Sequence, residues 1–282
     1  MGRMRRGWEL TQESWAVVRR DRSLLVFPVV GGICGVVVAA VVFGAGAGLA
    51  VAANAWWPAV PFLIVGSYLL IVIGQFCAVA LASCATAALD GRDTTVSEGV
   101  DAARGRLGLI LQWSAVQLVV GAAISALQAL LREAGGNVLG SIVGGLADFA
   151  WTVATFFVVP VIALEGLGPK DAIKRSSAVV RERWGEGVVG SAAIGLVAFL
   201  IALPGIALVV LGVAAFSASP AGGAALVAVG VVLIIAASLF QATISAVFRV
   251  ALFRFATQDE VTGGFTRAQL EGAFAPKRGG RI

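Results

Sequence analysis

The chain carries the sequence SWAVVR at residues 14–19 and returns to it, with one change, as SSAVVR at residues 176–181. A weaker copy, VDAAR, lies between the two at residues 100–104. Each copy stands shortly before a long apolar run. The pattern therefore predicts one structural unit that is used three times: a basic amphipathic helix followed by a hairpin of two membrane-spanning helices.

The composition is that of an integral membrane protein. Of the 282 residues, 59% are hydrophobic and 13% are charged, whereas soluble domains are nearer to half apolar and a quarter charged. The 36 glycines suit close contact between helices in lipid. Because the chain has no histidine, a Cys/His metal cluster is excluded, and we expect no cofactor.

Six apolar runs are long enough to cross a bilayer, which takes about 20 residues. They cover residues 24–53, 58–89, 107–131, 138–164, 188–216 and 221–248. Short breaks divide the two members of each pair, at residues 54–57, 132–137 and 217–220. The sequence therefore predicts an all-α bundle of six transmembrane helices built as three tandem units.

The predicted domains follow from these runs. A cytoplasmic arm with an interfacial helix takes residues 1–23, the six-helix domain takes residues 24–257, and a cytoplasmic tail takes residues 258–282. Two further interfacial helices are expected near residues 96–106 and 169–184.

Positive charge is very unevenly distributed between the two ends of the spans. Of the 21 Lys and Arg residues, 20 lie in the segments that share a side with the termini, and only Arg132 lies in the opposite loops. Positive residues stay preferentially on the cytoplasmic side. We therefore expect a multi-pass protein of the plasma membrane with both termini in the cytoplasm.

The predicted interfacial helices share an apolar stripe with the spacing of one helix face. Its members are Thr11, Trp15, Val18 and Arg22 in the first helix, Val96, Val100, Ala103 and Leu107 in the second, and Ile173, Ser177, Val180 and Trp184 in the third. Thr95 and Glu98 resemble a capping box, and Pro169 suits a first helical position.

One arginine recurs at an equivalent position in all three helices, as Arg19, Arg104 and Arg181. Basic residues at a membrane surface attract anionic headgroups by about 1 kcal/mol each. These arginines therefore either bind anionic lipid or a protein partner, or serve only to orient and anchor the chain.

Asp148 is the candidate polar site inside the membrane, since it stands about ten residues into the fourth predicted span. A charged side chain there is costly unless it is paired or hydrated. Five glutamines are candidate partners: Gln75, Gln112, Gln117, Gln128 and Gln241. Asp148 either holds helices together by hydrogen bonding or takes part in proton or substrate movement.

A second candidate cluster lies at the cytoplasmic end of the spans. Arg249 and Arg254 close the sixth span, while Asp90 and Glu165 follow the second and fourth. The two arginines either reach to lipid headgroups or form ion pairs with these two acids.

Several motifs resemble an uncharacterised family of bacterial and archaeal polytopic membrane proteins, catalogued as a domain of unknown function. They are DxxLLxFP at residues 21–28, FVVPVxxxEG at 157–166, PxxAxxRS at 169–176 and RxAT at 254–257. The resemblance implies six membrane spans and no assigned activity. A weaker likeness exists to the membrane domains that accompany glycerophosphodiester phosphodiesterases, whose acidic and histidine motifs are absent here.

No catalytic constellation, phosphate-binding loop or metal cluster is found, so we expect a protein that is not an enzyme and binds no nucleic acid. The sequence favours a membrane scaffold that binds anionic lipids at the cytoplasmic face, and a protein partner or further copies of itself. The alternative is a transporter or channel subunit that uses Asp148.

Overall fold

The computed structural model describes residues 12–19, 21–183, 189–216, 219–262, 264–267 and 270. Over these residues the chain is all-α with no β-strand, as the sequence predicts. It divides into two compact units. The central unit comprises Val26–Ala87 and Thr94–Gly185, and the terminal unit the described parts of Met1–Leu25, Ala88–Asp93 and Glu186–Ile282.

The helices of the central unit follow one another with short connections. They are α2 (Val26–Ala52), the 3-10 turn η2 (Trp57–Ala59), α3 (Val60–Leu89, whose last two residues belong to the terminal unit), α4 (Val96–Arg104), α5 (Leu107–Ala154), α6 (Val158–Pro160), the π-helical turn η3 (Val161–Glu165) and α7 (Pro169–Arg183). α7 packs against α5, α6 and η3.

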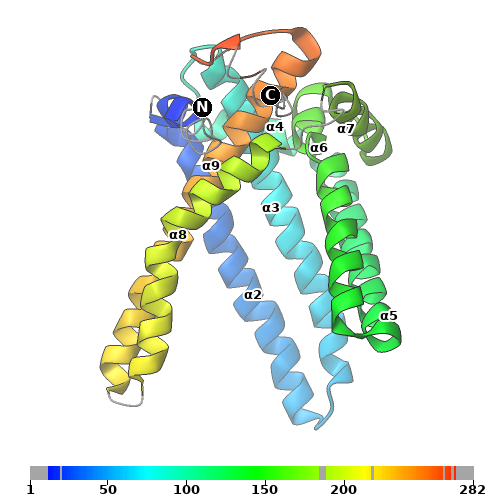
Figure 1. Ribbon diagram of the computed structural model, residues 1–282, viewed down its shortest axis with the longest axis vertical. Coiled ribbons are helices and arrows are strands. Elements are labelled where there is room, and N and C mark those ends of the chain that lie inside the picture. Colours follow the sequence, from blue (N-terminus) through cyan, green and yellow to red (C-terminus); the bar gives the residue numbers. More distant parts are fainter. Residues whose placement is uncertain are drawn as a thin grey trace, which may run out of the picture. The chain divides into compact units, whose positions relative to one another are not determined.

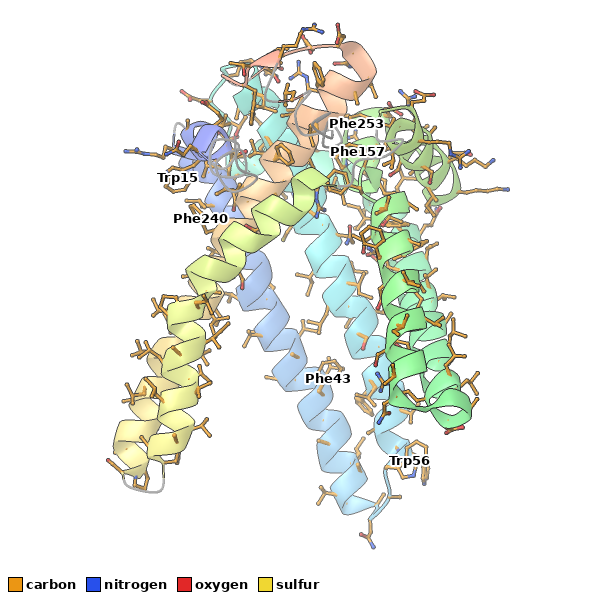
Figure 2. The ribbon with its side chains drawn as sticks, viewed as in Figure 1. Trp15, Phe43, Trp56, Phe157, Phe240 and Phe253 are labelled. Carbon is orange, nitrogen blue, oxygen red and sulfur yellow. The ribbon has the colours of Figure 1, made fainter. Side chains whose placement is uncertain are left out.

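α2 and α3 form the first hairpin, with a turn in which Asn54 takes a φ of 51°. Trp56 lies at this turn with 78% of its surface exposed (Figure 2). Such a place suits the aromatic belt of a membrane interface. Within the hairpin, a methyl group added at Gly66 would overlap the ring of Phe43. Glycine there makes room for the aromatic side chain.

α5 is itself a hairpin, which folds back on itself at Gly136 (Figure 1). Gly136 has a φ of 80° and a ψ of 171°, inside what is otherwise continuous helix. Glycine adopts a positive φ at little steric cost. The break expected over residues 132–137 is therefore much narrower than predicted. Its first arm, Leu107–Ala134, is long and apolar enough to cross a membrane, and so is the span Gly136–Glu165, which comprises the second arm together with α6 and η3.

The terminal unit contains a second tightly packed hairpin. The helical elements described in this unit are a helix over residues 12–19, the 3-10 turn η1 (Arg22–Leu25), α8 (Val189–Ala215) and α9 (Pro220–Gln258). The hairpin is formed by α8 and α9. α8 and α9 run side by side (Figure 1). α8 continues through Pro204, and α9 begins with Ser219 as its N-cap, since the Ser219 hydroxyl accepts a hydrogen bond from the Gly222 N–H at 3.2 Å.

Two pairs of glycines bring the backbones of α8 and α9 together: Gly205 with Gly230, and Gly212 with Gly223. A methyl group added at Gly230 would lie 2.7 Å from the carbonyl oxygen of Gly205, and one added at Gly212 would lie 2.8 Å from that of Gly223. Small residues permit this approach of helices, which drives their association in lipid.

By length and composition, five helices among the described residues suffice to span a membrane: Ser23–Ala52, Trp57–Leu89, Leu107–Ala134, Gly136–Glu165 and Pro220–Gln258. A shorter apolar helix covers Ala202–Ala215, within α8. Large apolar side chains remain exposed along these helices, as with Val36 and Val210. Five of the six predicted spans thus meet the criteria of a membrane helix, whereas the fifth predicted span contains, among its described residues, an apolar helix too short to meet them.

The buried faces of the predicted interfacial helices differ by about one residue from the predicted stripe. The side chains of Ser14, Val17 and Val18 are buried in the first helix, Gly99 and Ala103 in α4, and Ala172, Ser176, Val179 and Val180 in α7. Val18, Ala103 and Val180 were expected to be buried, whereas the predicted Leu107 is exposed. Thr11 and Trp184, and the side chain of Arg22, lie outside the described residues.

Candidate functional site

α4 is fixed at its start by a side-chain cap. The Thr95 hydroxyl accepts a hydrogen bond from the Glu98 N–H at 3.3 Å, as the capping motif predicts. A methyl group added at Gly99 would lie 2.6 Å from Cys84 Sγ and 3.2 Å from the carbonyl oxygen of Ala80. Because Gly99 has no side chain, α4 lies directly against α3.

α7 begins at Pro169, three residues after Gly166, which ends η3 with a φ of 64°. From its buried face, the hydroxyl of Ser176 accepts a hydrogen bond from the backbone N–H of Phe157 at 3.0 Å. This bond satisfies a donor at the break between α5 and α6, which a buried chain would otherwise leave unpaired. α7 is thereby held against the end of the α5 hairpin.

The helix over residues 12–19 packs against α9 within the terminal unit. The ring of Trp15 packs on that of Phe240 in α9, with 4.8 Å between ring centroids (Figure 2). Arg19, Arg104 and Arg181 are all exposed on their helices. Arg104 makes an exposed ion pair with Asp101 at 3.4 Å, and such pairs are worth less than about 1 kcal/mol. The three arginines therefore keep their charge on the surface, opposite the buried faces.

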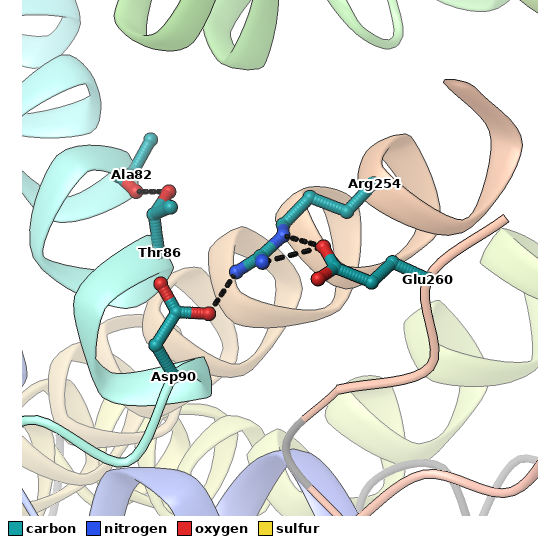
Figure 3. A network of polar contacts seen from close by, with 5 residues as sticks. All are labelled: Ala82, Thr86, Asp90, Arg254 and Glu260. Atoms are coloured by element: carbon teal, nitrogen blue, oxygen red, sulfur yellow. Dashed lines mark hydrogen bonds and ion pairs between the residues drawn. The ribbon is translucent and has the colours of Figure 1, made fainter. Parts of the chain in front are cut away.

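Among the described residues of the terminal unit, Arg254 forms the shortest ion pairs. Its guanidinium lies between the carboxylates of Asp90 and Glu260, both at 2.6 Å (Figure 3). A second bond to Glu260, from Nε, measures 3.1 Å. The Arg254 side chain is only 8% exposed, against 35% for Asp90 and 50% for Glu260. A buried arginine with two carboxylates is stabilised, whereas removal of one partner leaves an unpaired charge.

The structure thus brings together Arg254 and Asp90, which are 164 residues apart in the chain. Glu165, the other predicted acid, forms an ion pair with Arg175 of α7 at 3.2 Å. Arg249 lies half-buried in α9. Glu260 is not among the residues predicted from the sequence, although it stands two residues after the end of α9, where the chain turns back at Asp259 with a φ of 55°. An acid six residues after Arg254, just beyond the helix end, is the signal that would have identified it.

Beyond α9, the chain folds back onto the helix end. Arg267 donates hydrogen bonds to both carboxylate oxygens of Asp259, at 2.9 and 3.1 Å, and its guanidinium lies 5.6 Å from the ring centroid of Phe255. Phe265 and Leu270 are buried. The described part of the tail is therefore packed against its own unit.

Asp148 lies in the second arm of α5, and its Oδ2 accepts a hydrogen bond from Gln128 Nε2 at 3.3 Å. Gln128 is on the first arm, and its side chain lies over Gly144, where a methyl group would overlap it. Of the five glutamines considered as partners, Gln128 is the one that donates a hydrogen bond to Asp148. The Asp148 side chain itself is exposed.

Among the described residues, no group of three or more Cys, Asp or Glu side chains is placed to hold a metal ion. The arrangement instead provides ion pairs, a hydrogen-bonded acid within a span, and three surface arginines.

Comparison with known proteins gives one match. No curated protein matches the chain, and no solved structure does, so the likeness to the membrane domains of glycerophosphodiester phosphodiesterases is without support. The model of a family of unknown function (DUF6159) matches residues 57–264. That range includes every helix from α3 to α9 and the whole Arg254 cluster. The chain belongs to this family of unknown function, as its motifs predict.

Proposed function

We propose that this protein is a non-enzymatic scaffold of the plasma membrane, which binds anionic phospholipid headgroups through three repeated basic helices. The observation that carries the proposal is the common pattern of burial in these helices. When Arg19, Arg104 and Arg181 are aligned, the residue one position earlier is buried in each: Val18, Ala103 and Val180. The residue five positions earlier is small and buried in each: Ser14, Gly99 and Ser176.

This pattern supports the view that the three helices are copies of one structural unit. Each helix buries a small-residue face against its own unit and turns an arginine outward. Helices of this kind lie in the plane of a membrane interface. The charge distribution, with 20 of 21 basic residues on one side of the spans, supports a cytoplasmic position for all three helices and for both termini.

Retention of anionic lipid tests this proposal. We expect the triple variant Arg19→Gln, Arg104→Gln and Arg181→Gln in nanodiscs of phosphatidylcholine and phosphatidylglycerol to bind phosphatidylglycerol more weakly, by roughly fivefold for each arginine removed. Energy transfer from tryptophan to a labelled phosphatidylglycerol measures this affinity. Arg132→Gln is the matched control, because Arg132 is exposed but lies in the first arm of α5, four residues before the turn at Gly136. Equal binding by the triple variant and the wild type would refute the proposal.

The alternative is a transporter or channel subunit, which the position of Asp148 favours. Its carboxyl is exposed within a span and bonded to Gln128, and acids within membranes commonly serve proton pathways. Proton flux into liposomes that contain a pH-sensitive dye separates the two functions. The scaffold gives no flux above that of empty liposomes, whereas flux that Asp148→Asn abolishes would establish transport.

A further inference from the structure

The exposed surface of the α5 hairpin has two different faces within the membrane-spanning region. On the second arm, one face carries the exposed apolar residues Ile142, Leu146 and Phe149, which suit contact with lipid tails. The neighbouring face carries exposed polar and small residues at the spacing of one helical stripe. These are Ser141, Gly145, Asp148 and Thr152. We call this second set the polar face of α5.

The first arm contributes to the polar face. Gln128 reaches Asp148 from that arm, and Ser125 and Gly121 precede Gln128 by three and seven residues on the same side of the helix. Both Ser125 and Gly121 are exposed. A methyl group added at Gly121 or at Gly145 would meet no atom within 4 Å. The surface beside the acid is therefore open to close approach by another backbone.

The depth of Asp148 makes lipid tails an unsuitable neighbour. The residue stands 12 positions after the start of the candidate span Gly136–Glu165 and 17 before its end, which is roughly 18 Å and 26 Å along a helix. The hydrocarbon core is about 30 Å thick. Lipid tails offer no hydrogen-bond partner, so a polar group facing them at this depth carries a cost of several kcal/mol.

We propose that the polar face of α5 is the contact between two copies of this chain in the membrane. Two copies inserted in the same orientation are related by a twofold axis along the membrane normal. Such an axis places every residue at the same depth as its counterpart, and so brings Asp148 to the partner's Asp148. In its neutral form each carboxyl donates one hydrogen bond and accepts another. The pair is self-complementary, and Gln128 supports each carboxyl from its own chain.

Gly121 and Gly145, which have open space beside them, also favour contact with a second copy. The twofold axis sets the Gly145 position of one chain near that of the other, and small residues at such contacts let helices approach closely. The proposal is independent of the lipid-binding function, because the polar face contains none of the three surface arginines. If the lipid-binding test fails, the proposed dimer contact is unaffected. If the dimer test fails, the proposed lipid binding is likewise unaffected.

Cysteine crosslinking tests the contact directly. In a chain whose Cys34, Cys77 and Cys84 are replaced by serine or alanine, Gly145→Cys in vesicles of phosphatidylethanolamine and phosphatidylglycerol is expected to form a disulfide-linked dimer under mild oxidation. Leu146→Cys is the matched control, since it is one residue away but on the apolar face. No dimer from Gly145→Cys, or equal crosslinking from Leu146→Cys, would overturn the proposal.

Single-molecule photobleaching of labelled protein in the same vesicles supplies a second measurement. Wild type is expected to show two bleaching steps at a frequency that rises with protein density. Asp148→Leu raises the dimer dissociation constant by roughly threefold to thirtyfold, in keeping with interhelical hydrogen bonds in membranes. Asp148→Asn keeps a donor and an acceptor, and so keeps the dimer. Single-step bleaching of wild type at every density would overturn the proposal.

Discussion

The hairpin of α5 and the hairpin of α8 with α9 both have glycine where their two arms touch. The two hairpins differ in what packs against the glycine, which is backbone in one and a side chain in the other. In α8 and α9, Gly205 and Gly230 admit backbone, since an added methyl group on either would lie within 3 Å of the other's carbonyl oxygen. In α5, Gly144 admits the side chain of Gln128, which continues to Asp148. Glycine thus serves close backbone contact in one hairpin and an exposed polar connection in the other.

The two hairpins also differ in where their polar groups lie. The described part of α8 is apolar, and the ion pairs of α9 gather at its end, around Arg254. In α5 the polar pair lies in the middle of the hairpin. The first arrangement keeps acidic groups out of the described middle of the helix pair. The second accepts the cost of such a group, which implies that the group has a use beyond holding two arms together.

The largest expected effect tests the backbone contact. Gly230→Leu is expected to lower the free energy of unfolding by about 3 kcal/mol, because neither the Gly205 carbonyl nor the Val209 backbone N, 2.8 Å from the added carbon, can move aside. Unfolding in SDS followed by tryptophan fluorescence measures it. Gly44→Leu is the matched control, since its added carbon meets no atom within 4 Å. Equal losses in the two variants would remove the contrast between the hairpins.

A somewhat smaller effect tests the polar end of α9. Arg254→Leu leaves Asp90 and Glu260 without their shared cation, and is expected to lower the free energy of unfolding by about 2 kcal/mol in the same assay. Arg267→Leu provides the comparison, because Arg267 and Asp259 are both more than half exposed and such pairs contribute less than about 1 kcal/mol. A loss no larger than that of Arg267→Leu would show that the cluster does not anchor α9.

The next effect separates the two uses of glycine. Gly144→Ala is expected to cost about 1 kcal/mol of unfolding free energy by displacing the flexible side chain of Gln128. The double variant Gly144→Ala with Gln128→Ala then regains most of the loss, because the obstructing side chain is gone. Gly230→Ala has no such rescue by Val209→Ala, since backbone atoms are in the way. Rescue at both positions, or at neither, would contradict the comparison.

The smallest effect concerns the hydrogen bond itself. Gln128→Leu is expected to lower the stability of the isolated monomer by only about 0.6 kcal/mol, the average for a polar pair between membrane helices. Ser238→Ala in α9 should change stability less, because the Ser238 hydroxyl bonds to the Ile234 carbonyl of its own helix at 2.8 Å. A loss of several kcal/mol from Gln128→Leu would make the Asp148 pair a main support of the fold rather than a contact surface.

Hydropathy and turn chemistry predicted most of the helix pattern. Gly91 and Gly166, which follow α3 and η3, have positive φ values of 76° and 64°, because a left-handed residue at a helix terminus is adopted cheaply only by glycine. Thr95 caps α4 for a similarly local reason. Such features depend on a few neighbouring residues, and the sequence contains all of them.

The buried faces of the interfacial helices were less predictable. Ranking residues by hydrophobicity favours Trp15, whereas the structure buries Ser14 completely and leaves Trp15 half-buried against Phe240. Close packing selects small residues for helix contacts, and aromatic side chains go to the edges. The face therefore depends on how near the neighbouring helix comes, which the sequence of one helix does not contain.

The partner of Asp148 could be found only once the turn was located. Residues at equal distances on either side of Gly136 face each other, as Gln128 and Gly144 do, eight positions away from it. Asp148 then lies one helical turn further. A break spread over residues 132–137 leaves this register undefined. Likewise, Glu260 meets Arg254 only because the chain reverses at Asp259.

The single-residue turn at Gly136 has a consequence for sequence change within the family. A helix rotates by about 100° per residue, so one residue inserted there would turn the whole second arm and carry Asp148 to a different side of the hairpin. Substitutions elsewhere in α5 alter one contact each, whereas a change in length at this point would exchange its lipid-facing and polar surfaces. We therefore expect related chains to vary in residue type along both arms, while the number of residues between the positions of Gln128 and Asp148 stays constant.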